Sequence, residues 1–220
     1  MPPTSHALLT RRATLIGLGA AQLAGPALAQ PVELRLAAIG QALIRHDLRR
    51  HPWPGMGPIQ ARLAANHVVF SDLEVAIAGP NQGAPTRAAD TLHLADPIVI
   101  DCLRELGVTG LATANNHAFD VGTGGIVDAI AALQSRAMPF AGTGLDLARA
   151  AAPGVQQTSA GRFAFVAFAT GFVREGGMAG PDRPGVNEVR RNPDDEELLE
   201  QDVTRILEAI FEQDFLVYSF

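Results

Sequence analysis

The stretch "GLATANNHAFDVGTGGIVDAIAAL", residues 110–133, decides the fold. Its small apolar start predicts the end of a buried strand, 108–114. A loop with two asparagines, a histidine and an aspartate follows, and the segment 124–136 then predicts an apolar helix. A strand that leads through a polar loop into a helix is the repeating unit of a parallel α/β sheet. We therefore expect an α/β protein.

Two earlier segments end in a similar way. The predicted strand 32–39 runs into Gly40 and Gln41, and the predicted strand 67–70 runs into Ser71-Asp72-Leu73-Glu74. Because ligand sites of open α/β sheets lie beyond the carboxyl ends of the strands, we expect these polar residues to lie side by side.

The other elements before residue 150 follow from apolar spacing, capping residues and Gly or Pro positions. Asp96 is a candidate N-cap of the helix 97–106, and Gly107 is its expected stop. The remaining expectations are helices at 42–50 and 59–65, loops at 51–58 and 79–91, and a short strand and turn at 138–144.

The pattern changes after residue 150. "GVQQTSAGRFAFVAFATG", 154–171, predicts a hairpin with Ala160-Gly161 in its turn. The Gly- and Pro-rich segment 171–187 predicts a surface loop. An acidic amphipathic helix, 194–213, and an apolar strand, 214–220, complete the expected order.

The first 29 residues have the layout of an export signal. Arg11 and Arg12 precede a weakly apolar segment, 13–24, and Ala27-Leu28-Ala29 is a small-x-small cleavage site. The paired arginines resemble a twin-arginine (Tat) signal. An ordinary Sec signal and a membrane anchor are the alternatives, and the anchor is weaker because glycines, Gln22 and Pro26 interrupt the segment. We expect a leader at 1–29 and one domain at 30–220.

The composition excludes several function classes. All 17 basic residues of the 220-residue chain are arginine, so lysine Schiff-base and Walker-lysine chemistry are ruled out. The formal net charge of −6 argues against nucleic-acid binding. The single cysteine, Cys102, lies among apolar residues, and we expect a buried core thiol.

The polar strand ends together could hold a metal ion. Two carboxylates, an imidazole and carboxamides suit divalent ions such as Mn, Zn or Fe. Spacing alone favours a simpler interpretation, with turn-forming asparagines, a helix-capping Asp72 and a solvated loop histidine. The histidines His46, His51, His67 and His93 show no pattern that indicates a site.

The sequence motifs in these segments resemble those of a known family. "TANNHAFDVG", 113–122, is similar to the Asn-Asn-His signature of the CapA family, the poly-γ-glutamate capsule-synthesis proteins, which belong with the calcineurin-like metallophosphatases. Five further segments support this resemblance and occur in the family's order along the chain: "LAAIGQALIRHDLR", "FSDLEVAI", "MPFAGTGLDLARAAAP", "GRFAFVAF" and "RPGVNEVR". The resemblance covers residues 33–220. It implies a metallophosphatase-like layered sandwich of two mixed sheets flanked by helices.

The resemblance also assigns roles to residues. It implies Asn116, Glu74 and, less directly, Asp72 as metal ligands, with Gln41 where the family often has aspartate. It implies that His117 stabilises or protonates the reacting oxygen and that Asp120 orients His117. A neutral Gln41 removes one anionic ligand, so we expect weak metal binding.

The implied function is metal-assisted hydrolysis by an exported protein of cell-surface polymer metabolism, in the periplasm or cell envelope. The family's later histidines, expected beyond a strand like "DFLVYSF", do not occur in this sequence, whose last histidine is His117. We therefore expect an incomplete copy of the fold with little turnover. The alternative is a non-catalytic module that binds an envelope polymer or takes part in capsule assembly. The expected partners are an anionic cell-surface polymer or capsule-assembly proteins, with membrane contact only during export.

Overall fold

The computed structural model describes residues 33–88, 92–171, 173–190, 196–211 and 216–219. The predicted export signal lies outside these residues. The chain divides into two units, 1–33 and 34–220, and every element described below belongs to the second unit. None of the helices in the described ranges is long and apolar enough to cross a membrane.

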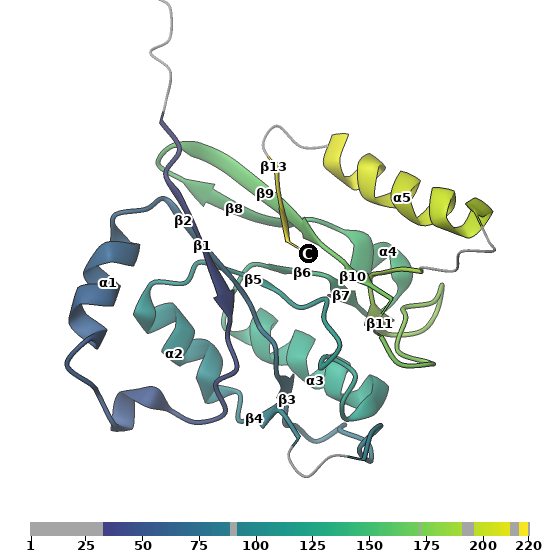
Figure 1. Ribbon diagram of the computed structural model, residues 1–220, viewed down its shortest axis with the longest axis horizontal. Coiled ribbons are helices and arrows are strands. Elements are labelled where there is room, and N and C mark those ends of the chain that lie inside the picture. Colours follow the sequence, from purple (N-terminus) through teal and green to yellow (C-terminus); the bar gives the residue numbers. More distant parts are fainter. Residues whose placement is uncertain (1–32, 89–91, 172, 191–195, 212–215, 220) are drawn as a thin grey trace, which may run out of the picture. The chain divides into compact units, whose positions relative to one another are not determined.

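The first sheet has four parallel strands in the order β1-β2-β5-β6 (Figure 1). Helices or short strands connect them, as the strand–loop–helix pattern predicted. The strands are β1 (Leu36–Gln41), β2 (Val68–Asp72), β5 (Gly110–Ala112) and β6 (Phe140–Ala141). The main helices are α1 (Met56–Ala64), α2 (Ile98–Leu106) and α3 (Gly122–Ser135).

The second sheet is mixed, with the order β13-β9-β8. Strands β8 (Gly154–Thr158) and β9 (Gly161–Ala167) form the predicted hairpin, and β13 (Leu216–Ser219) lies parallel to β9. Gly161 begins β9 with φ +121°, a conformation that favours glycine, so the turn occurs where the sequence predicted it.

The two sheets share a core because residues of β2 alternate between its faces. Val69 packs with the cluster of buried residues from α1 and α2, whereas Val68 and Phe70 pack toward the second sheet. The rings of Phe70 and Phe165 meet edge to face with centroids 4.9 Å apart. The facing sheets of the expected sandwich are therefore present.

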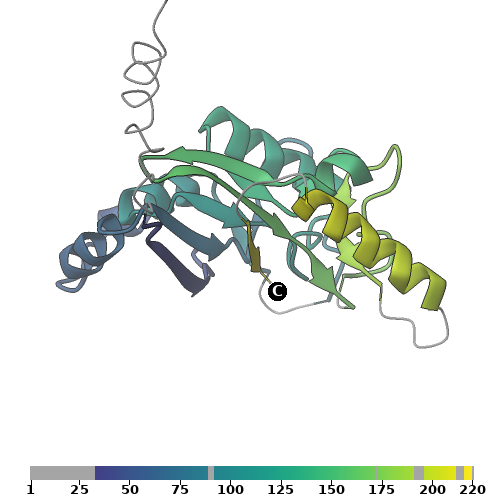
Figure 2. The same cartoon turned by 90° about the horizontal axis from the view of Figure 1, so that it is seen from above.

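Helix α5 (Glu196–Phe211) lies beside the β8–β9 hairpin in both views (Figures 1 and 2). Its Ile206 packs with Val166 of β9 and with Val189. Helices thus lie outside both sheets, and the α/β sandwich is confirmed. One detail differs, because the first sheet is parallel throughout and only the second is mixed.

Several short elements complete the unit. Strands β3 (Ala76–Ile77) and β4 (Leu94–Ala95) pair in parallel. The others are a 3-10 turn η1 (Leu48–Arg50), α4 (Leu147–Ala151), and the strands β7 (Thr143–Gly144), β10 (Ala169–Thr170), β11 (Gly185–Val186) and β12 (Glu188–Val189).

Three sequence expectations need correction. The helix predicted at 42–50 is only η1, because the Ala42 N–H donates to the Asp72 carbonyl and continues the β1–β2 pairing instead. The helix predicted from residue 59 already begins at Met56. The predicted loop 171–187 contains β11, which pairs with β7.

The helix expected at 97–106 is present as α2, and Gly107 ends it with φ +107°, as the sequence predicted. The N-cap position is Pro97 and not Asp96, although Oδ1 of Asp96 accepts the Ile98 N–H at 2.9 Å. Cys102 is buried, and its Sγ lies 3.1 Å from Oδ1 of Asp47, a contact that the sequence did not predict. Burial and this bond raise the pKa of the Cys102 thiol.

Candidate functional site

The ends of three parallel strands meet at one edge of the first sheet. Gln41 of β1 pairs with Asp72 of β2, and Asp72 pairs with Ala112 of β5. The Asn115 amide donates to Oδ1 of Asp72 at 2.8 Å and to the Leu73 carbonyl at 2.9 Å. The segments that the sequence placed at a common edge are therefore physically connected.

The loop after β5 turns around the Asn115 side chain. Its Oδ1 accepts the N–H groups of His117 at 3.0 Å and of Ala118 at 2.9 Å. Asn115 is buried, whereas Asn116 is only half-buried, and the main-chain oxygen of Asn116 accepts a hydrogen bond from Arg174. Of the two asparagines, Asn115 shapes the loop, whereas the family resemblance pointed to Asn116.

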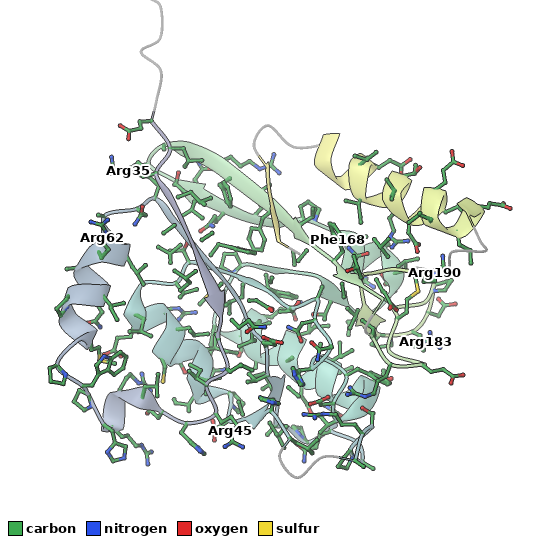
Figure 3. All side chains as sticks on the ribbon, viewed as in Figure 1. Arg35, Arg45, Arg62, Phe168, Arg183 and Arg190 are labelled. Carbon is green, nitrogen blue, oxygen red and sulfur yellow. The ribbon has the colours of Figure 1, made fainter. Side chains whose placement is uncertain are left out.

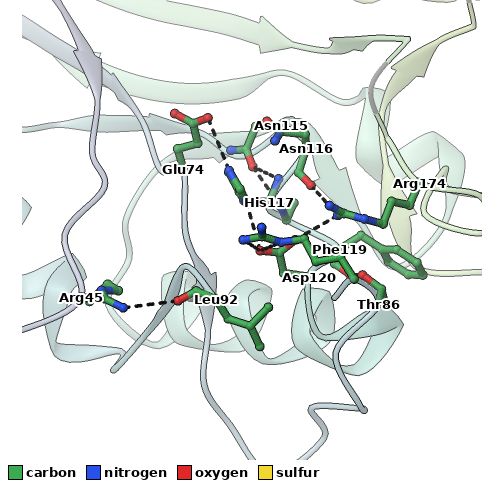
Figure 4. Close-up of polar contacts among 12 residues, drawn as sticks. Arg45, Glu74, Thr86, Leu92, Asn115, Asn116, His117, Phe119, Asp120 and Arg174 are labelled. Carbon is green, nitrogen blue, oxygen red and sulfur yellow. Dashed lines mark hydrogen bonds and ion pairs between the residues drawn. The ribbon is translucent and has the colours of Figure 1, made fainter. Parts of the chain in front are cut away.

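His117 lies between two carboxylates (Figure 4). Its Nδ1 is 3.0 Å from Oδ2 of Asp120, and its Nε2 is 4.0 Å from Oε1 of Glu74. Because a carboxylate accepts hydrogen bonds, Asp120 holds the proton on Nδ1 and directs Nε2 toward Glu74. The structure thus brings Glu74, His117 and Asp120 into one cluster.

Asp120 is the buried anchor of this cluster. Its side chain has no exposed surface, and it accepts hydrogen bonds from Nε of Arg87 at 3.0 Å and from Nη1 of Arg174 at 2.9 Å. Burial opposes ionisation of Asp120, but the bonds from Arg87 and His117 outweigh it and hold its pKa below the usual range. Asp120 is therefore a carboxylate at neutral pH.

The segment between β3 and β4, which carries Arg87, is held firmly against α3. The main-chain N–H and the side-chain amide of Asn81 donate to the buried Asp128 at 2.9 and 2.7 Å. A Cβ atom on Gly124 of α3 would lie 1.6 Å from the Asn81 carbonyl oxygen, so only glycine permits this approach.

Glu74 and Asp72 form the acidic part of the site. Burial, together with the nearby charge of Glu74, raises the pKa of Asp72 to about 6, although its bond from Asn115 opposes the rise. Glu74 is 7% exposed, and its Oε2 has no hydrogen-bond partner within the described part of the chain. An unsatisfied buried oxygen beside a second carboxylate is the kind of environment that a cation would stabilise.

Few side chains at this edge of the sheet could contribute oxygen ligands to a cation. Asp72 and Glu74 supply the anionic oxygens, Gln41 is exposed beside Asp72, and Asn116 lies in the adjoining loop. Within the described ranges, no group of three or more His, Cys, Asp or Glu side chains is arranged to hold a metal ion. This set is smaller than the complete shell of a tight zinc or iron site.

Sequence reasoning missed three residues of the site. The His93 ring lies 4.3 Å from the His117 ring, centroid to centroid, and burial together with the charges of His117 and Arg87 lowers the pKa of His93. Arg87 and Arg174 occupy segments that composition identified only as a turn region and a surface loop. Their long side chains reach Asp120 across the fold, which local patterns do not reveal.

Comparison with known proteins agrees with the family resemblance of the sequence motifs. Residues 35–220 match the family described as bacterial capsule synthesis protein PGA_cap. Two uncharacterized proteins of Sinorhizobium fredii (strain NBRC 101917 / NGR234), y4sH and y4uA, are each 30% identical to this chain over 163 residues. The alignments cover 70% of this chain and 35% of each relative, so the chain spans about a third of their length.

Proposed function

The chain belongs to the PGA_cap family of bacterial capsule synthesis proteins, and we propose that its Glu74–His117–Asp120 cluster is the centre of a metal-assisted hydrolase. The proposed substrate is an anionic cell-surface polymer, with poly-γ-glutamate or a phosphoester as the first choices to test. One observation carries the proposal: His117 is fixed through Nδ1 by a buried carboxylate while its Nε2 faces the acidic edge of the sheet.

His117 is the proton carrier in this proposal. Nε2 donates a proton to the oxygen or nitrogen that leaves, and the Asp120 carboxylate stabilises the imidazolium form and keeps the ring oriented. The two arginines on Asp120 keep that carboxylate ionised. The roles of His117 in proton transfer and of Asp120 in orienting the ring are argued from charge and geometry and do not depend on the metal.

A divalent ion at Asp72 and Glu74 would polarise a substrate oxygen beside His117. Manganese, zinc and iron are the candidates, and the small donor set supports weak binding. Gln41→Asp should tighten binding because it adds a carboxylate next to Asp72. Unchanged manganese affinity in Gln41→Asp would place residue 41 outside the site.

Product analysis tests the proposed reaction. The protein is incubated with manganese and either poly-γ-glutamate or p-nitrophenyl phosphate, and released amines or phosphate are measured. We expect slow release from at least one substrate and loss of that release in Glu74→Gln. No release from either substrate, or equal release by Glu74→Gln, contradicts the proposal.

A second candidate function is a non-catalytic module that binds the polymer or capsule-assembly proteins. The small set of metal donors in the described ranges favours it. It predicts that poly-γ-glutamate binds, as seen by sedimentation, without any new chain ends. Shortening of the bound polymer would exclude this alternative.

The proposed location is the cell envelope or periplasm. Membership in a capsule synthesis family supports association with the envelope, and the twin-arginine pattern in residues 1–29 supports export through the Tat route with cleavage after Ala29.

A further inference from the structure

Two arginines from segments far apart in the sequence meet at the Nδ1 side of His117. Arg87 precedes β4, and Arg174 follows β10. Both donate to Asp120, at 3.0 and 2.9 Å. Figure 4 shows the contact of Arg174 with Asp120. The opposite edge of the imidazole, Nε2, faces Glu74. The centre therefore has an acidic side and an arginine side, with His117 between them.

The guanidinium groups that hold Asp120 reach the surface, whereas the carboxylate does not. The side chains of Arg87 and Arg174 are 20% and 29% exposed, and that of Asp120 has no exposed surface. Arg174 is the more exposed of the two arginines, so it is the one that can meet a ligand.

Arg174 has hydrogen-bonding capacity to spare. Its Nη1 serves both Oδ1 of Asp120 and the main-chain oxygen of Asn116, at 2.9 and 3.1 Å. In the part of the chain that the structure describes, neither Nε nor Nη2 of Arg174 has a hydrogen-bond partner. Two donors on one planar guanidinium match the paired oxygens of a carboxylate or phosphate.

The turn after Arg174 holds its backbone in place. The Gly177 N–H donates to the Arg174 carbonyl at 2.8 Å. A Cβ on Gly177 would lie 3.0 Å from Cγ of Phe119 and 2.6 Å from Cγ1 of Val173, so the turn packs directly on the loop that carries His117. Arg174 is thereby fixed relative to the catalytic candidate and not merely near it.

We propose that Arg174, supported by Arg87, forms an oxyanion-binding subsite that holds a carboxylate or phosphate group of the substrate beside His117. Its part in turnover rests on the proposed function, but anion binding can be measured separately. The subsite selects substrates with an anionic group close to the bond that is broken. A polymer with a carboxylate on every repeat and a phosphoester both satisfy this requirement.

Calorimetric titration with inorganic phosphate, and in a separate arm with glutarate, tests the subsite. Arg174→Gln should weaken binding of the preferred anion about 10- to 100-fold, the range expected for a charge-assisted hydrogen bond. Arg62→Gln is the matched control, because Arg62 is an exposed arginine of α1 (Figure 3). We expect the control to bind like the unchanged protein.

Arg174→Lys separates anion recognition from support of the fold. It retains the charge but loses the planar pair of donors, so its affinity should fall between those of the unchanged protein and Arg174→Gln. If Arg174→Gln does not fold, Arg174→Lys carries the test, with thermal unfolding as the check. A preference for phosphate or for glutarate identifies which oxyanion the subsite takes.

Three results would overturn the subsite: no measurable anion binding by the unchanged protein, the same affinity in Arg174→Gln, or an equal loss in Arg62→Gln. Failure of the proposed hydrolysis is distinguishable from these. Anion binding that depends on Arg174 in a protein without turnover supports the subsite and rejects the reaction, whereas turnover with unchanged KM in Arg174→Gln rejects the subsite alone.

Discussion

Nδ1 of His117 and Oδ2 of Asp120 lie 3.0 Å apart, and only two residues separate them in the chain. This short-range contact is possible because the Asn115 side chain turns the backbone at His117 and Ala118. A single loop therefore supplies both the imidazole and the carboxylate that orients it. The rest of the site is arranged around this pair.

Asp120→Asn should lower the free energy of unfolding by roughly 3 kcal/mol, because it leaves two guanidinium groups against a buried neutral amide. Urea denaturation measures the change. Asp101→Asn is the control, since Asp101 is 27% exposed and pairs with Arg136 at a partly exposed position, where an ion pair contributes about 1 kcal/mol or less. Equal losses in the two variants would show that burial of Asp120 does not matter.

Asp202 should make the free energy of unfolding depend on pH in the acidic range. Burial opposes its ionisation, but bonds from Arg190 and Arg205 hold its pKa below the value near 3.9 of an unfolded chain. Its contribution is present above about pH 4 and is lost as the pH falls through the lower, folded pKa, because the unfolded state takes up the proton first.

Asp202→Asn should therefore destabilise the protein by roughly 2 kcal/mol at pH 7, a value reduced for the partial exposure of Arg190. The difference from the unchanged protein should shrink as the pH is lowered from about 4 toward about 2. Denaturation curves across this range provide the measurement. A difference that stays constant with pH would contradict the assignment.

Gly124→Ala should destabilise the protein by about 1–3 kcal/mol, because the new methyl group would overlap the Asn81 carbonyl and displace the segment that carries Arg87. Gly57→Ala in α1 is the control: a Cβ atom at Gly57 would have no neighbouring atom within 4 Å, and helix propensity should stabilise this variant by about 0.5–1 kcal/mol. Thermal unfolding distinguishes the two, and a stabilised Gly124→Ala would refute the close contact.

Substitution of the arginine pair in the predicted signal tests export through the Tat route. Replacement of Arg11 and Arg12 by lysine should leave the protein unprocessed in the cytoplasm, because a Tat signal requires the arginine pair. Cell fractionation and N-terminal sequencing give the result, with Gln30 as the expected first residue of the mature chain. Normal processing of the double variant would exclude the Tat route, and a different first residue would exclude the cleavage site.

The parts of the fold that could be predicted are those encoded in local patterns. The segment 110–133 contains a buried strand, a polar loop and an apolar helix in succession, and β5 and α3 follow from it. The β8–β9 hairpin was equally accessible from its alternation and turn. The helix predicted at 42–50 was wrong, because the tertiary pairing of Ala42 with Asp72 overrides a helical pattern.

The candidate site was predictable only in part for the same reason. Glu74 and His117 follow strands of one parallel sheet, so topology alone places them together. Arg87, Arg174 and His93 reach the site through long side chains or ring contacts between distant segments, and no spacing rule relates them. The greater importance of Asn115 for the loop depends on burial, which the motif does not encode.

The most direct test of the central claim is the initial rate of hydrolysis by His117→Gln, measured with manganese on whichever substrate the unchanged protein cleaves. His51→Gln, at an exposed histidine near η1, is the control. We expect a loss of at least about 100-fold in His117→Gln, the size typical of a general acid, in a protein that thermal unfolding shows to be still folded, and a normal rate in the control. An undiminished rate in His117→Gln would contradict the role of His117 as the proton carrier.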